Sequence, residues 1–311
     1  MLSDSEGWYT TGIMKQFYLC EITTKDNLVH QGLYFEPSKK NKKAMLWVHG
    51  LTDNFYGDRT ILETFTQYCE SEGWGFASFN TRGHDVVASL TKVDPSLSKG
   101  RIHINGGAGY EMFKDCILDI DAGISFLINQ GFSEIIIAGI STGANKVCYY
   151  EGTQDDHRVA GVALISPLSD VPIKQKELGK VYRATVKKVE TLVAKRKADE
   201  LILGYDYMPL TAARFLSLYR AGGAEDVFQY HREKSDTSVF AGIKKPLLVV
   251  LGGRDEYADR PMPDIKKFFD THQRSSYYQS VIIPGGFHSY RGKEKEFVDA
   301  FASWIKPLWR H

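Results

Sequence analysis

The sequence lacks most of the features that would place it outside ordinary globular proteins. Its four cysteines lie far apart, at positions 20, 69, 116 and 148, with no C-x-x-C pair and no histidine at metal-ligand spacing. Disulfides and metal sites are therefore not expected, and a reducing compartment is favoured. No apolar run reaches membrane-spanning length, and the first seven residues have neither the basic nor the apolar region of a secretion signal. We therefore expect a cytoplasmic protein without membrane contact.

An excess of charge of one sign is also missing. The 311 residues include 39 lysines and arginines and 38 aspartates and glutamates, which gives a formal net charge of +1. This balance argues against a nucleic-acid surface and against a broadly charged membrane face. Apolar residues make up 43% of the chain, enough to build a sizeable core. The length fits one large domain or a domain with an insertion.

The stretch from residue 133 to residue 150 organises the rest of the chain. Residues 135–138 are a short β-branched run, which indicates a strand buried in a parallel sheet, and residues 144–150 indicate a helix. Between them, residues 139–143 form a G-x-S-x-G motif at a sharp turn from strand to helix. Such a turn strains the backbone of the serine and lifts its hydroxyl above the sheet edge. Ser141 is therefore a candidate nucleophile.

Strands and helices alternate along much of the chain. Strands are expected at residues 17–24, 28–35, 44–48, 75–80, 135–138, 159–165, 246–251 and 277–283, and helices at 61–70, 113–129, 144–150, 263–271 and 293–308. The first two strands are expected to form a hairpin at the sheet edge, and residues 89–108 a loop. The alternation predicts an α/β fold, a mostly parallel central sheet with helices on both faces. From about residue 169 to residue 240 no strand is expected, only a long charged helix over 180–203 and a shorter one over 209–219.

Three side chains stand on loops at the carboxyl ends of predicted strands, where ligands bind in such sheets. Ser141, Asp255 and His288 follow in the chain order that accompanies G-x-S-x-G elbows. A serine hydroxyl needs an imidazole to take its proton, and a carboxylate holds that imidazole in the required tautomer. Glu256 and Asp259 are alternatives to Asp255 on the same loop.

Two backbone N–H groups are candidate donors to a tetrahedral oxyanion, those of Thr142, just after the nucleophile, and Leu51. Leu51 follows His49 and Gly50, and His49 is interpreted as structural. His84 and His103 lie in loops nearer the site than His30, His157, His272 and His311, and either is a candidate for lining a pocket.

With these motifs the chain resembles serine hydrolases of the α/β-hydrolase fold over residues 16–166 and 241–308. The motifs are residues 49–51, 80–84 and 139–143 with Asp255 and His288. The turns at 49–52 and 82–84 are similar to those of cytosolic carboxylesterases and feruloyl-type esterases, and the elbow and residues 113–126 are more weakly similar to fungal siderophore esterases. Ile140 departs from the histidine that many relatives carry before the serine, which should alter packing and leave the mechanism unchanged.

The resemblance implies an α/β-hydrolase core of residues 1–167 and 241–311, a helical cap (lid) insertion of residues 168–240, and a Ser-His-Asp triad. Candidate substrate-binding residues are His84, Tyr205, Tyr207, Met208, Phe215 and Phe287. Basic residues outnumber acidic ones in much of the cap, either as a solvated face or as a mouth that attracts anions. The absence of a nucleophilic aspartate disfavours dehalogenases and epoxide hydrolases.

The expected function is hydrolysis of a small-molecule carboxylic ester through an acyl-serine, with no cofactor and no metal. Two alternatives stay open. The same triad can cleave a thioester, an amide or a carbon–carbon bond, and a homologue without turnover can bind and sense a ligand. The sequence is also compatible with a homodimer.

Overall fold

One large mixed sheet forms the centre of the computed structural model, which describes residues 16–57 and 59–308. Within those residues ten strands pair in the order β12-β11-β8-β7-β3-β4-β2-β5-β6, and β1 is attached to β2. The strands are β1 (Tyr18–Thr23), β2 (Leu28–Phe35), β3 (Lys43–Val48), β4 (Gly75–Phe79), β5 (Ala88–Val93), β6 (Arg101–Gly106), β7 (Glu134–Ile140), β8 (Val159–Ile165), β11 (Leu247–Gly252) and β12 (Tyr278–Ile283). Neighbours from β12 to β4 run parallel, whereas β1, β2, β5 and β6 pair antiparallel. The predicted mostly parallel sheet is confirmed. The first seven residues, on which the expectation of no secretion signal rested, lie outside the described residues.

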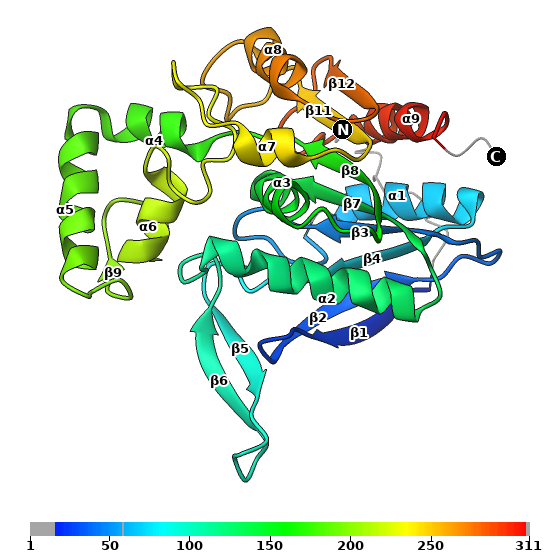
Figure 1. The fold of residues 1–311 in the computed structure, drawn as a ribbon, viewed down its shortest axis with the longest axis horizontal. Coiled ribbons are helices and arrows are strands. Elements are labelled where there is room, and N and C mark those ends of the chain that lie inside the picture. The colour runs from blue at the N-terminus through cyan, green and yellow to red at the C-terminus, as the bar shows by residue number, and fades with distance from the viewer. Residues whose placement is uncertain (1–15, 58, 309–311) are drawn as a thin grey trace, which may run out of the picture.

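Helices cover both faces of this sheet (Figure 1). One face packs against α2 (Cys116–Asn129), α3 (Thr142–Gln154) and α8 (Met262–His272), and the other against α1 (Arg59–Glu72) and α9 (Glu294–Ile305). Side chains alternate along a strand, so β7 sends Ile135 and Ile137 into the first layer and Ile136 and Ala138 into the second. A strand buried on both faces needs the continuous apolar run that the sequence has there. The short elements η1 (Phe113–Asp115) and α7 (Ser238–Gly242) complete the core.

Residues 88–106 form a β-hairpin, so the prediction of a loop over 89–108 was wrong. Strand β5 pairs with β6 along its whole length and with β2 at one end. The apolar residues Ala88 and Leu90 alternate with polar ones and are buried against Leu28. Figure 1 shows this hairpin extending away from the rest of the sheet.

The segment inserted after β8 is mainly helical and lies to one side of the core (Figure 1). It contains α4 (Asp170–Leu178), η2 (Gly179–Val181), α5 (Tyr182–Ala194), β9 (Leu201–Ile202), β10 (Leu210–Thr211) and α6 (Ala212–Tyr219). The single helix predicted over residues 180–203 is wrong, because α5 ends at Ala194 and Arg196 adopts a φ of 60°. The chain then turns back and β9 pairs with β10. We call α4 to α6 with these two short strands the cap.

Cys116 and Cys148 are buried free thiols, as expected for cysteines in apolar helical patterns. None of the helices in the described part of the chain combines the length and the apolar character that crossing a bilayer requires.

Helix α3 buries one carboxyl group near its C-terminal end. Glu151 is 1% exposed, and neither of its carboxyl oxygens has a hydrogen-bond partner within residues 16–57 and 59–308. Burial raises the pKa of Glu151 from 4.5 to about 8, Lys245 opposes the rise, and Asp155 adds to it. The folded protein therefore retains a proton that the unfolded chain releases. The contribution of the protonated Glu151 carboxyl group to the free energy of unfolding is fully present below pH 4.5 and is lost as the pH rises toward 8.

Replacing Glu151 by glutamine removes this titration. We expect Glu151→Gln to match the wild type in Tm near pH 4.5 and to exceed it by at least about 2 °C at pH 8.5. Thermal unfolding followed by circular dichroism over this pH range measures the difference. The control is Glu190→Gln on the exposed face of α5, which should leave the pH dependence unchanged. A Tm difference independent of pH would contradict the argument.

Candidate active site

Ser141 occupies a strained turn between β7 and α3. Its φ of 56° and ψ of −128° lie in a region that costs a residue with a side chain about 1–3 kcal/mol. The N–H of Ser141 donates to the carbonyl of Ile165 at the end of β8, at 2.9 Å, which holds the turn against the neighbouring strand. The serine therefore stands at the carboxyl edge of the sheet at the beginning of a helix.

The two glycines of the motif are required by close backbone contacts. A Cβ on Gly139 would collide with the carbonyl of Gly143, and one on Gly143 would collide with the carbonyls of Val48 and His49. Strand β7, helix α3 and the loop after β3 thus pass one another at a separation that admits no side chain. The two glycines of the motif are therefore required for the close crossing of the backbones, just as the serine is required for the site.

His288 and Asp255 meet on the neighbouring loops after β12 and β11. The distance between His288 Nδ1 and Asp255 Oδ2 is 2.8 Å, and the Asp255 side chain is fully buried. Of the alternative acids, Glu256 accepts the backbone N–H of His288 at 2.9 Å, and Asp259 binds Arg260. Of these three acids, Asp255 is the one whose carboxylate reaches the imidazole.

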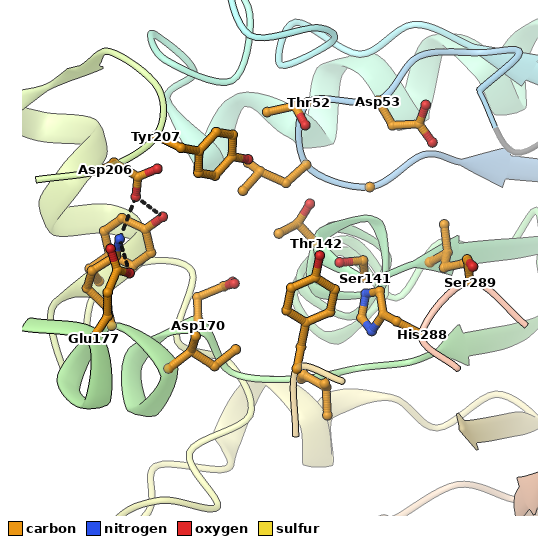
Figure 2. Close-up of a pocket in the computed structure, with 18 residues that line it drawn as sticks. Thr52, Asp53, Ser141, Thr142, Asp170, Glu177, Asp206, Tyr207, His288 and Ser289 are labelled. Atoms are coloured by element: carbon orange, nitrogen blue, oxygen red, sulfur yellow. Dashed lines mark hydrogen bonds and ion pairs between the residues drawn. The ribbon is translucent and has the colours of Figure 1, made fainter. Parts of the chain in front are cut away.

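Ser141 and His288 line the same cavity, and Figure 2 shows the imidazole beside the serine. Within the described residues no hydrogen bond joins the two side chains. A nucleophile and its base often close to hydrogen-bonding distance only when substrate is present.

Hydrogen bonds of two hydroxyl groups, those of Ser166 and Tyr290, fix the loop that carries His288. Ser166 Oγ, just after β8, donates to the carbonyl of His288 and also lies 3.0 Å from the hydroxyl of Tyr290. The Tyr290 hydroxyl in turn donates to the carbonyl of Val250 on β11. Neither residue was singled out from the sequence as part of the site. The signal for Ser166 was its position, because it ends a strand as the other candidates do.

The N–H groups of Leu51 and Thr142 belong to residues that line the cavity next to Ser141. His49 is fully buried beneath the Leu51 turn, where its Nδ1–H donates to the carbonyl of Gly50 and its Nε2 accepts the N–H of Thr81. Burial, assisted by the nearby Lys146 ammonium, lowers the pKa of His49 to about 3, so the ring stays neutral. His49 therefore holds the turn and does not exchange protons, as its structural interpretation requires.

A buried chain of charges connects the cap to this turn. Lys146 on α3, 1% exposed, donates to Thr81 Oγ1 at 3.0 Å and forms an ion pair with Glu111 at 2.7 Å. Arg214 on α6, fully buried, reaches the same Glu111 at 3.3 Å and pairs with Glu225. Each charge is thus neutralised by a partner on another segment, so the cap and the core are fixed together electrostatically.

The cavity has a volume of about 550 Å³, which suits a small-molecule ligand. One wall comes from the core and includes Leu51, Ser141, Thr142 and His288. The opposite wall comes from the cap and includes Asp170, Lys174, Asp206, Tyr207 and Tyr219.

Of the six candidate substrate-binding residues, the structure places Tyr207 on the cavity. Tyr205, Met208 and Phe215 pack in the cap's own apolar core. His84 bonds to Asp85 at 2.9 Å, and the ring of Phe287 lies beside the guanidinium of Arg254. Aromatic residues at helical spacing in a small cap are needed for its packing, which leaves few of them for the cavity.

The basic residues of the cap mostly face solvent, including Lys180, Lys187 and Lys188. Lys174 does line the cavity, but its ammonium already binds Glu177 at 2.6 Å and Asp206 at 2.7 Å. Asp170 was not singled out from the sequence. It lies four residues after Ser166, so the same attention to strand ends would have found it.

Comparison with known proteins places this geometry in a family. A family model described as "Protein of unknown function (DUF1749)" matches residues 84–306. The chain belongs to this family. No curated protein matches the sequence.

Similar solved structures include the esterase Pf2001 of Pyrococcus furiosus, with 15% identity, a TM-score of 0.57, and coverage of 94% of this chain and 91% of that one. Est1E from Butyrivibrio proteoclasticus with ferulic acid bound has 15% identity, a TM-score of 0.64, and coverage of 93% and 99%. The siderophore hydrolase EstB from Aspergillus fumigatus has 15% identity, a TM-score of 0.65, and coverage of 95% and 99%. With the sheet order, these likenesses confirm the predicted α/β-hydrolase fold.

The buried charge chain predicts a specific pattern of stabilities. Lys146→Met leaves the Glu111 carboxylate buried without its nearest cation, and we expect it to lower the free energy of unfolding by about 3–5 kcal/mol. The double variant Lys146→Met/Glu111→Gln removes the stranded charge and should recover at least about 1 kcal/mol of that loss. Urea denaturation measures both.

The control is Lys295→Met, which breaks an exposed ion pair with Asp299 and should cost less than about 1 kcal/mol. Equal losses in the single and double variants would show that the charge on Glu111 is unimportant.

Proposed function

We propose that this protein is a serine hydrolase that cleaves a carboxylic ester of a small molecule through an acyl-serine intermediate. The observation that carries the proposal is the arrangement around Ser141. A serine in a strained turn faces the same cavity as His288, whose Nδ1 lies 2.8 Å from the buried carboxylate of Asp255.

In the first half of the reaction, Ser141 Oγ attacks the ester carbonyl carbon while His288 Nε2 takes the hydroxyl proton. Asp255 accepts the Nδ1–H bond and stabilises the imidazolium. The N–H groups of Leu51 and Thr142 donate to the oxyanion, and each such donor lowers the barrier by about 3–4 kcal/mol. When the tetrahedral intermediate collapses, His288 returns the proton to the leaving oxygen and the alcohol departs.

In the second half, water attacks the acyl-serine and His288 again acts as the base. The carboxylic acid is released and Ser141 recovers its proton. Both halves use the same three side chains and the same two N–H groups, so no cofactor is required by the scheme.

The choice of an ester bond draws on the compared structures, of which one is an esterase, one is a siderophore hydrolase and one has ferulic acid bound. The cavity of about 550 Å³ accommodates a small ester and would exclude a folded protein.

A fluorophosphonate probe tests whether Ser141 is an activated nucleophile. The wild type should be labelled at one site per chain, and Ser141→Ala should lose both labelling and ester hydrolysis. Asp255→Asn should reduce kcat by about 10³- to 10⁴-fold with little change in KM, because the imidazole loses its preferred tautomer. The control Ser89→Ala, an exposed serine on β5, should react as the wild type does. A wild type that is folded and remains unlabelled would favour a ligand-binding protein.

A panel of matched acyl donors tests the bond type. With one acyl group, we expect kcat/KM for the p-nitrophenyl ester to exceed that for the corresponding anilide by at least about 10³-fold, and that for an alkyl thioester by at least about tenfold. The ratios are measured at one pH with the Ser141→Ala variant as background. A preference for the thioester or the anilide would assign the same triad to another bond.

A further inference from the structure

One carboxyl group faces the cavity without a protein partner. Asp170, the first residue of α4, makes no hydrogen bond and no ion pair with any other described residue, yet it lines the space that Ser141 and His288 line. Figure 2 shows its carboxyl group pointing into the space between Tyr207 and Ser141. Asp170 is partly buried, and a partly buried charge without a partner is stabilised when a ligand of opposite charge binds it.

The nearby cations are already engaged. Lys174 lies one helical turn from Asp170, but its ammonium contacts Glu177, Asp206 and the carbonyl of Tyr205. Arg214 is bound to Glu225 and Glu111 and is not among the residues that line the cavity. The cap wall therefore presents three carboxylates, from Asp170, Glu177 and Asp206, against one ammonium.

Aromatic rings accompany this carboxyl group. Tyr207, 75% exposed, and Tyr257, 52% exposed, line the cavity with Asp170. The ring of Tyr257 lies edge-on to the His288 imidazole with 4.9 Å between centroids, so this ring is close to the catalytic side. Tyrosine faces next to a carboxylate are the surroundings that bind quaternary and protonated amines.

We propose that the Asp170 side of the cavity is a cation subsite that binds a quaternary or protonated amine carried by the ester substrate. This inference rests on the proposed ester hydrolysis and names the class of substrate. The ammonium lies against Asp170 and the tyrosine rings, while the ester carbonyl lies at Ser141. The Lys174 ammonium cannot repel the bound cation strongly, because the carboxylates of Glu177 and Asp206 neutralise its charge.

The subsite should respond to pH through Asp170 itself. Burial raises its pKa to about 7, Glu225 adds to the rise, and Arg214, His288 and Lys174 oppose it. The other titratable groups around it are Glu177, Asp206, Tyr207, Tyr219 and Tyr230. The carboxyl group is therefore mostly neutral at pH 6 and mostly charged at pH 8.

Two pairs of isosteric esters test the subsite. Butyrylcholine is compared with 3,3-dimethylbutyl butyrate, which places the cation on the alcohol side. The p-nitrophenyl esters of 4-(trimethylammonio)butyrate and 5,5-dimethylhexanoate place it on the acyl side. For at least one pair we expect kcat/KM at pH 8 to favour the cation by at least about tenfold. The reaction at Ser141 is common to both members of a pair and cancels in the ratio, so protonation of Asp170 should lower the preference by at least about threefold at pH 6.

Asp170→Asn should abolish the preference while hydrolysis of the neutral esters stays within about threefold of the wild type. The control Glu190→Gln removes the same unit of charge from an exposed position of the cap and should leave the preference intact. A variant that slows both members of each pair equally, or a preference that survives in Asp170→Asn, would overturn the inference.

Binding of hexyltrimethylammonium, measured by calorimetry at pH 8, does not depend on turnover. We expect Asp170→Asn to weaken it by at least about tenfold, and equal affinity in both proteins would refute the subsite. Hydrolysis of the neutral esters without any preference refutes the subsite alone. Failure to hydrolyse every ester, with cation binding that depends on Asp170, refutes the proposed reaction alone.

Discussion

The close crossing of β7, α3 and the loop after β3 is the constraint on which the site depends. At Gly139 and Gly143 the backbones touch, so the serine between them has no alternative conformation that keeps the strand and the helix in place. The same contact presses the carbonyls of Val48 and His49 against the beginning of α3. One steric condition thereby fixes the position of the Ser141 hydroxyl and of the loop that carries Leu51. The strain at Ser141 is compensated by the packing of two buried helical layers and a sheet.

The cap is tied to this crossing by charges as well as by apolar contacts. Arg214 from the cap and Lys146 from α3 both form ion pairs with the carboxylate of Glu111. Lys146 also donates a hydrogen bond to the Thr81 hydroxyl, which lies within hydrogen-bonding distance of His49 Nε2. Buried ions are tolerated only when each has a partner, so displacing α6 would strand at least one of these charges. The cap wall and the N–H groups opposite it are therefore held in one arrangement. A cavity with both walls fixed in this way can position a ligand relative to Ser141 without first reorganising.

The sequence contained enough local information for the elbow and for the order of Ser141, Asp255 and His288, because each follows a short apolar strand and carries its own glycines. It contained less for elements whose stability comes from distant segments. Strand β5 pairs along its whole length with β6, but it joins the rest of the sheet only at one end, through β2, about sixty residues earlier in the chain. Its alternating pattern was obscured by the Gly and Asn residues around it. In the cap, the turn at Arg196 depends on the pairing of β9 with β10, which no helical periodicity reveals. The place of Asp170 shortly after a strand end could be read from the sequence, but whether its carboxyl group has a partner is a property of the folded wall.

The polar groups on the two walls of the cavity differ in whether they have hydrogen-bond or ion-pair partners within the protein. We relate this difference to separate tasks, the reaction on the core wall and ligand recognition on the cap wall. On the core wall the imidazole of His288 has Asp255 and the loop beneath it has Ser166, so the polar groups there are held in place before any ligand arrives. On the cap wall Lys174, Asp206 and Tyr219 satisfy one another, with 2.5 Å between the Tyr219 hydroxyl and Asp206, whereas Asp170 has no hydrogen-bond or ion-pair partner among the described residues. A preorganised nucleophile lowers the barrier for any acyl group that reaches it. Discrimination between substrates must then come from a group whose free energy changes on binding, and an unpaired, partly buried carboxylate changes more than a paired one. On this reasoning Asp170, rather than Ser141 and its neighbours on the core wall, is the group that we propose to set the specificity.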